Sequence, residues 1–176
     1  MKKLIFALLL LLAAPVAQAE TMIVGAEIPL SYAFTTADDG GTLDADGAPS
    51  GIIGYIGLPV IGTFGIESYV INLTDTDSSE IQTQMLDYMY TFLLPFLDIS
   101  IGVGGGVGTT QVTGDLSSNY SAATSSQYFF KLGIPIFGVM QLRATLARVN
   151  AQIEKSDGDF LEAGGTMVAF GVAMGF

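Results

Sequence analysis

Six charged residues stand in stretches that are otherwise apolar or rich in glycine, which makes them the first candidates for chemistry. Paired carboxylates can act as general acid and base, and a carboxylate beside a cation can relay protons or form a structural ion pair. The 176-residue chain contains no histidine and no cysteine. It therefore lacks the commonest general base, every Ser-His arrangement and thiolate ligands for a metal. The six residues are Glu27, Glu67, Asp87, Asp98, Lys131 and Arg143.

The clearest structural element near these residues is the stretch 97–110, LDISIGVGGGVGTT. Its large apolar residues fall on one face, and its aspartate, glycines and hydroxyl residues fall on the other, with the period of two that a β-strand has. An apolar face opposite a small polar face is typical of a barrel wall with lipid outside and a narrow lumen inside. The same alternation places the six charged residues on the lumen side.

The overall hydropathy points to a membrane protein without spanning helices. The mean hydropathy is +0.54, yet beyond the first 19 residues no stretch of about 18 apolar residues is uninterrupted. Only helices and closed barrels satisfy every backbone group in lipid. The sequence therefore predicts an all-β, antiparallel transmembrane β-barrel. A soluble β-sandwich or lipocalin-like barrel is the alternative.

Proline spacing gives the strand count. Pro59, Pro95 and Pro135 recur at intervals of 36 and 40 residues, each before a short turn, and long polar stretches lie between them. This spacing fits two strands, one short turn and one long loop per repeat. We predict eight strands, four long outer loops, three short periplasmic turns and both termini in the periplasm. The predicted strands are 22–34, 51–60, 62–73, 81–93, 96–110, 127–136, 138–153 and 161–176.

The first 19 residues read as a secretory signal peptide. Lys2 and Lys3 precede an apolar run, and the run ends at the small-residue triplet Ala17-Gln18-Ala19. The domain organisation predicted is a signal peptide over 1–19 and a single barrel domain over 20–176. An uncleaved membrane anchor is the alternative reading of the leader.

The charge balance limits the partners. The formal net charge is −11, so nucleic-acid binding, which needs basic patches, is excluded. Most acidic residues lie in the predicted outer loops, where they can be solvated or share divalent cations with lipopolysaccharide phosphates. The segment TLDADG resembles part of a calcium loop, but it lacks the first acid and the closing glutamate. Asp44 and Asp46 are therefore the only metal candidates, and no cofactor is expected.

The charged lumen layer has two interpretations: a plug of ion pairs that rigidifies the barrel, which we favour, or a binding or proton-relay site. Glu67 and Asp87 are expected to face each other across adjacent strands. The glycines of the lumen side imply either large residues opposite them or a cavity for an acyl chain. Pro29 cannot donate a ladder hydrogen bond, so it marks a candidate lateral opening to lipid.

The last ten residues, MVAFGVAMGF, alternate large apolar side chains with Ala or Gly. Gly171, Val172, Met174 and the terminal Phe176 resemble the C-terminal signature that the barrel-assembly machinery reads in bacterial outer-membrane barrels, although Met174 stands where that family usually has an aromatic residue. With the leader and hairpin count, the chain resembles the small eight-stranded class that includes OmpX, Ail and the OmpA membrane domain. The resemblance implies a monomer in the outer membrane of a Gram-negative bacterium, surrounded by lipid and lipopolysaccharide and delivered by periplasmic chaperones.

The resemblance also bears on activity. Known enzymes among outer-membrane barrels, such as the omptin proteases, the lipid A deacylase, the palmitoyltransferase and the phospholipase, rely on a histidine that this chain lacks. We therefore expect a non-catalytic barrel of structural or surface-interaction type that presents acidic outer loops. The alternatives are a carrier that binds lipid or a small apolar ligand in a glycine-lined lumen with lateral access, and a narrow passive pore.

Overall fold

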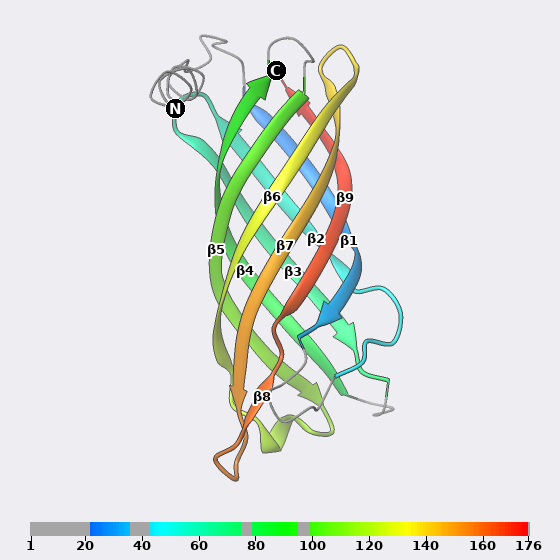
Figure 1. Ribbon diagram of the computed structural model, residues 1–176, viewed down its shortest axis with the longest axis vertical. Helices are drawn as coiled ribbons and strands as arrows, with labels where there is room; N and C mark the ends of the chain where they lie inside the picture. Colours follow the sequence, from blue (N-terminus) through cyan, green and yellow to red (C-terminus); the bar gives the residue numbers. More distant parts are fainter. Residues whose placement is uncertain (1–21, 36–42, 75–78, 95–98, 176) are drawn as a thin grey trace, which may run out of the picture.

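The computed structural model describes residues 22–35, 43–74, 79–94 and 99–175, and these residues form a closed antiparallel barrel (Figure 1). Each strand from β1 to β7 pairs with the next, β8 and β9 both pair with β7, and the ring closes where β1 pairs with β9. The strands are β1 (Ile23–Phe34), β2 (Ser50–Leu58), β3 (Gly62–Asn72), β4 (Ser79–Leu94), β5 (Ile99–Gly114), β6 (Ala123–Phe137), β7 (Met140–Glu154), β8 (Phe160–Glu162) and β9 (Gly165–Gly175).

Strands β8 and β9 act as one wall element. Both pair with β7, and only Ala163 and Gly164 interrupt them. Counted in this way, the barrel wall has eight strands, and the prediction of an all-β, eight-stranded antiparallel barrel is confirmed. The predicted boundaries hold to within a few residues. The largest differences at the loop end are in β5, which ends at Gly114 instead of 110, and in β6, which begins at Ala123 instead of 127.

The short connections lie at one end of the barrel and the long ones at the other (Figure 1). Pro59 lies in the turn after β2, as its missing donor suggests. Pro135, in contrast, lies within β6 at a register shift, and Gly138 and Val139 make the turn. Pro95 lies outside the described residues. Ile23 and Gly175 pair with each other at the short-turn end.

The turn between β2 and β3 is strained. Val60 has a φ of 69°, and the amide of Ile61 donates to the carbonyl of Pro59 at 2.8 Å. A positive φ is unfavourable for a β-branched residue because its Cβ approaches the following carbonyl. The backbone conformation of Val60 therefore lowers the stability of the folded state.

The outer surface of the barrel carries a belt of exposed apolar side chains. They come from every long strand, as expected if the alternation turns one face outward throughout. Exposed apolar area of this extent is unusual for a protein surrounded by water. Its members include Val24, Ile28, Leu30, Ile52, Ile56, Phe64, Ile66, Leu86, Val103, Val107, Phe130, Ile134, Leu146, Val168, Phe170, Val172 and Met174.

No helix within the described ranges is long and apolar enough to span a membrane.

Toward the long loops the pattern reverses. There the outward positions of β4 and β5 are polar, and Gln111 donates to Gln82 across the surface at 3.0 Å. The inward positions are apolar and form a small core that includes Ile81, Val112 and Ile153. Polar outside and apolar inside is the arrangement of a water-exposed β-structure. The strands thus run beyond the apolar belt and enclose their own core at the outer end.

Candidate functional site

An ion pair lies at the centre of the lumen. The Lys131 ammonium, on β6, donates to Glu27 Oε1, on β1, at 2.6 Å, and the Thr145 hydroxyl, on β7, donates to the other oxygen at 2.5 Å. Glu27 is 1 % exposed and Lys131 4 %. The Lys131 nitrogen also lies 4.3 Å from the centroid of the Tyr55 ring. The hydrogen-bond partners of this ion pair are thus side chains of the barrel strands β1, β6 and β7.

The two acidic residues Glu67, on β3, and Asp87, on β4, are joined through a third side chain. The Gln127 amide nitrogen donates to Glu67 Oε2 at 2.9 Å and to Asp87 Oδ1 at 2.8 Å. The register places Glu67 opposite Met85 and Asp87 opposite Gly65, so the acids are diagonal neighbours rather than directly paired. Sequence reasoning missed Gln127, although its lumen phase, four residues before Lys131, was a usable signal.

Arg143 is the other cation of the lumen. It is 1 % exposed, and its guanidinium carbon lies 5.8 Å from the Tyr55 ring centroid. Among the described residues, its Nε and Nη1 atoms have no hydrogen-bond partner. Asp98, the sixth member of the predicted layer, lies outside the described residues. The structure thus brings five of the six predicted residues into the lumen, in two groups and one separate cation.

Large side chains fill the space beside the lumen glycines. Met89 lies against Gly102, Phe129 against Gly104 and Asp87 against Gly106, so that a Cβ at any of these glycines would overlap the side chain. The cavity that remains near Lys131 has a volume of about 10 Å³, which is space for roughly one water molecule. The glycine-lined lumen that we considered for an acyl chain is therefore occupied, within the described strands, by the protein itself.

The residues of the predicted assembly signal lie on both faces of β9. Val172 and Met174 point outward into the apolar belt. Gly171 faces inward opposite Glu27, where any Cβ would overlap the β1 backbone. Phe176 lies outside the described residues. Gly171 therefore has a structural reason of its own, because it lets β9 approach β1 where the barrel closes.

Among the described residues, β1 is paired beyond Pro29 on one side only. Pro29 pairs with Ala169 of β9, and that ladder continues to Phe34 after a register shift. The shift turns Leu30 and Ser31 outward in succession. On the other side, pairing between β1 and β2 ends at Glu27 opposite Ile53. Within the described residues, β1 beyond Glu27 thus has no ladder partner on its β2 side, and a lateral opening at Pro29 stays a prediction.

The first outer loop carries the metal candidates Asp44 and Asp46. Both are exposed, on either side of Ala45, which forms an isolated bridge with Leu73. Within the described ranges, no group of three or more acidic, histidine or cysteine side chains could hold a metal ion. The loop is thus positioned by backbone bonds to the end of β3.

Comparisons with known proteins agree with this architecture. No protein-family model matches the chain, and no curated protein sequence matches it. Among solved structures, the chain is similar to Neisserial surface protein A, with a TM-score of 0.67 at 11 % identity over 88 % of this chain and 97 % of that one. It is also similar to the outer membrane protein OprG from Pseudomonas aeruginosa, with a TM-score of 0.50 at 9 % identity over 90 % and 96 % of the two chains. The chain has the fold of small eight-stranded outer-membrane barrels.

Proposed function

We propose that this protein is a non-catalytic, non-conducting barrel of the bacterial outer membrane, which holds acidic loops outside the cell. The observation that carries the proposal is the combination of an apolar outer belt with a polar lumen. A barrel in water would place these surfaces the other way round, as its own outer end does.

A closed lumen supports the non-conducting part of the proposal. Glu27 and Lys131 join β1 to β6 across the interior, and Gln127 joins β6 to β3 and β4. Above them the apolar core around Ile81 and Ile153 fills the outer end. An ion would have to displace buried, mutually paired charges and then cross an apolar layer, both of which cost much free energy.

The loop end supports a surface role. Among the described residues of this end, acidic side chains outnumber basic ones, with Asp44, Asp46, Glu80, Asp115, Glu154, Asp157, Asp159 and Glu162 against Arg148 and Lys155. Arg148 is held at the edge of the belt by hydrogen bonds to Thr35 at 2.7 Å and Thr166 at 3.1 Å. A fixed cation at this height suits the phosphates of lipopolysaccharide. We further propose a monomer that the barrel-assembly machinery inserts with the help of periplasmic chaperones.

Cysteine labelling tests the orientation, since the chain has no cysteine of its own. Ser156→Cys places a thiol in the fourth outer loop, and Val139→Cys is the matched variant in a short turn. A membrane-impermeant maleimide on intact Gram-negative cells should label only the loop variant, and permeabilised cells should label both. Labelling of the turn variant on intact cells would contradict the orientation.

Planar-bilayer recording tests the closed lumen. The purified protein should give no stable conductance steps in neutral salt. Reproducible single-channel steps from the wild-type protein would overturn the non-conducting assignment while leaving the membrane location intact.

A further inference from the structure

We propose that the Glu67 carboxyl group holds a proton at neutral pH, and that this proton closes a hydrogen-bonded ring with the Gln127 amide. The lumen then contains a buried proton-binding site, and the stability of the closed barrel depends on whether that site is filled.

Two buried oxygen atoms of the lumen can accept hydrogen bonds but meet no donor. Among the residues that the structure describes, Glu67 Oε1 and Gln127 Oε1 have no hydrogen-bond partner. Glu67 is 2 % exposed and Gln127 5 %, so both atoms are shielded from bulk water. A buried acceptor without a donor is costly and therefore uncommon in folded proteins. The pair of oxygens thus points to a missing donor.

These two oxygens belong to groups that are already joined. The Gln127 amide nitrogen donates to Glu67 Oε2 at 2.9 Å and to Asp87 Oδ1 at 2.8 Å, which uses both of its hydrogens. An ionised glutamate can only accept hydrogen bonds, whereas a protonated one carries an O–H donor. With a proton on Oε1, the Glu67 carboxyl group donates to Gln127 Oε1 while its Oε2 accepts from the nitrogen. One proton therefore satisfies both unpaired atoms.

The charges around the site favour the same protonation state. Lys131 pairs with Glu27, and within the described ranges no cation forms an ion pair with Glu67 or Asp87. The accepting oxygens of these two acids lie less than about 6 Å apart, because both bond to one nitrogen. Two carboxylates this close, away from water, are not both ionised, and one of them keeps a proton.

Asp87 is the acid that keeps its negative charge. Its side chain is half-buried, whereas Glu67 is buried, and desolvation disfavours the charged form. Asp87 and Lys131 also line the same cavity of about 10 Å³, and one water there would bridge the carboxylate to the ammonium. With Glu67 neutral, the described lumen carries two negative and two positive charges.

The other groups that face the site do not supply the missing donor. The Tyr55 and Tyr69 hydroxyls have no hydrogen-bond partner among the described residues either. Strand β5 presents Gly106 opposite both Asp87 and Gln127. Besides Glu67, the titratable and charged groups of the described lumen are Glu27 and Tyr32 on β1, Tyr55 on β2, Tyr69 on β3, Asp87 on β4, Lys131 on β6 and Arg143 on β7.

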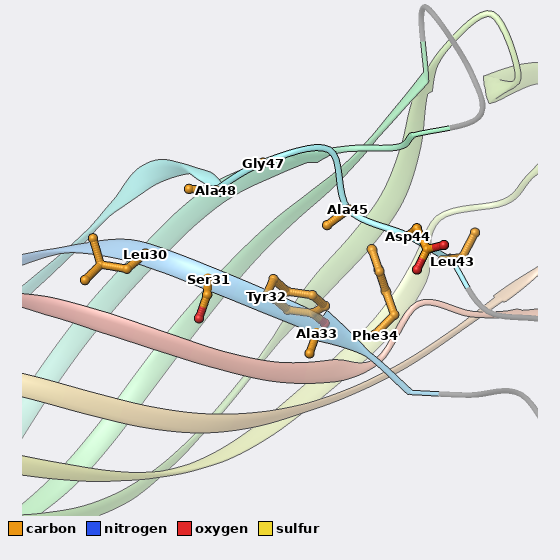
Figure 2. A pocket seen from close by; sticks show the side chains of 10 residues that line it. All are labelled: Leu30, Ser31, Tyr32, Ala33, Phe34, Leu43, Asp44, Ala45, Gly47 and Ala48. Carbon is orange, nitrogen blue, oxygen red and sulfur yellow. The ribbon is translucent and has the colours of Figure 1, made fainter.

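Aromatic rings separate the site from the outer end of the barrel. Tyr69 is the next lumen-facing residue on β3, and its ring centroid lies 6.0 Å from that of Tyr32 on β1. The Tyr32 ring in turn packs edge-on against Phe34, with 5.0 Å between centroids. Figure 2 shows Tyr32 and Phe34 on the outer part of β1. The surroundings of Glu67 are thus poor in water, which favours a neutral acid over a carboxylate.

Infrared spectroscopy of the wild-type protein tests the protonation directly, because a protonated carboxyl group has a carbonyl band apart from that of a carboxylate. The protein is measured in octyl glucoside micelles, which contain no carbonyl group. At about pH 7, where a glutamate in water is ionised, we expect one such band. Labelling the glutamate carboxyl groups with carbon-13 should move the band, and labelling aspartate should not. A missing band, or one that moves only with the aspartate label, would overturn the proposal.

The Glu67→Gln variant removes the acid but keeps the ring, since an amide both donates and accepts as a carboxylic acid does. E67Q should fold as the wild type does and lose the band. Glu80→Gln is the matched control, because Glu80 is an exposed glutamate on β4, and E80Q should keep the band. A band that persists in E67Q would place the proton elsewhere and refute the assignment.

Urea unfolding against pH gives a second readout. A folded state that holds a proton which the unfolded chain has released loses stability as the pH rises. From about pH 5 to about pH 7, the folding equilibrium constant of the wild type should therefore fall about tenfold per pH unit relative to that of E67Q. The same ratio taken against E80Q should stay constant. A ratio of wild type to E67Q that does not change with pH would also overturn the site.

Discussion

Replacing Lys131 by methionine removes the cation of the central ion pair and keeps a side chain of similar length. Among the residues that the structure describes, Glu27 then keeps the Thr145 hydroxyl as its hydrogen-bond donor while it stays buried. Replacing Glu27 by glutamine does the converse, because it leaves the Lys131 ammonium buried beside the Tyr55 ring without its anion. Each single variant therefore isolates one charge in the lumen.

The expected magnitudes follow from that isolation. Breaking one side of a buried ion pair costs about 3–5 kcal/mol, whereas replacing both members by neutral groups is often close to neutral. The contact between Lys131 and Tyr55, 4.3 Å from nitrogen to centroid, adds about 1–2 kcal/mol that the double variant also loses. We expect K131M and E27Q each to lower the free energy of unfolding by about 3–5 kcal/mol, and E27Q/K131M by only about 1–2 kcal/mol.

The measurement is a double-mutant cycle in phosphatidylcholine vesicles, with urea unfolding followed by circular dichroism. Gel mobility of unheated samples checks that each variant forms a barrel. Additive losses, with the double variant less stable than either single variant, would show that the two charges do not act as a pair. Losses below about 1 kcal/mol in both single variants would show that the lumen is hydrated, because surface pairs contribute only that much.

Three further variants test other positions. Gly171→Ala should greatly reduce barrel formation, because the added Cβ meets β1 backbone that cannot give way; the readout is the folded fraction on unheated gels. Val60→Asn should raise the free energy of unfolding by about 1 kcal/mol, because asparagine tolerates the positive φ of the first turn. Gln127→Leu should lower the free energy of unfolding by roughly 2–4 kcal/mol, because the buried Glu67 and the half-buried Asp87 lose their shared donor.

Each of these variants has a matched control. Gly54→Ala should leave barrel formation unchanged, since the added methyl group meets open space on the outer face. Val139→Asn changes an exposed turn valine without a positive φ and should give no gain. Gln82→Leu removes a glutamine from an exposed hydrogen bond and should cost well under 1 kcal/mol. A control that changes as much as its test variant would refute the reasoning for that site.

The barrel could be predicted from the sequence because alternation fixes both the strands and their faces. Stretches such as 97–110 alternate without interruption, so the lumen side of Asp87, Lys131 and Arg143 follows from counting. Alternating stretches of this kind also recur along the chain, and with the spacing of the prolines they give the count of eight strands. Neither inference needs knowledge of which side chains meet.

The finer arrangement could not be predicted, because it depends on shear and on one irregularity. Which strands Lys131 reaches across the lumen is set by the stagger of the closed barrel, and alternation says nothing about stagger. The bulge after Pro29 reverses the phase, so that Tyr32 points into the lumen instead of outward. Pairing between β1 and β2 ends at Glu27, and the first loop docks through backbone contacts with Asn72 and Leu73; both are contacts between distant segments, which alternation does not encode.

The reversal of polarity along β4 and β5 fixes how deep the protein sits in the membrane. A downward shift of two residues along these tilted strands, roughly 5 Å of depth, would carry Gln84 and Gln111 into hydrocarbon. The opposite shift would lift Leu86 and Val107 into water. The barrel therefore has one preferred depth in the membrane, and movement along the membrane normal costs free energy in either direction. Each position on the outer face of the barrel therefore stays in the same layer of the bilayer.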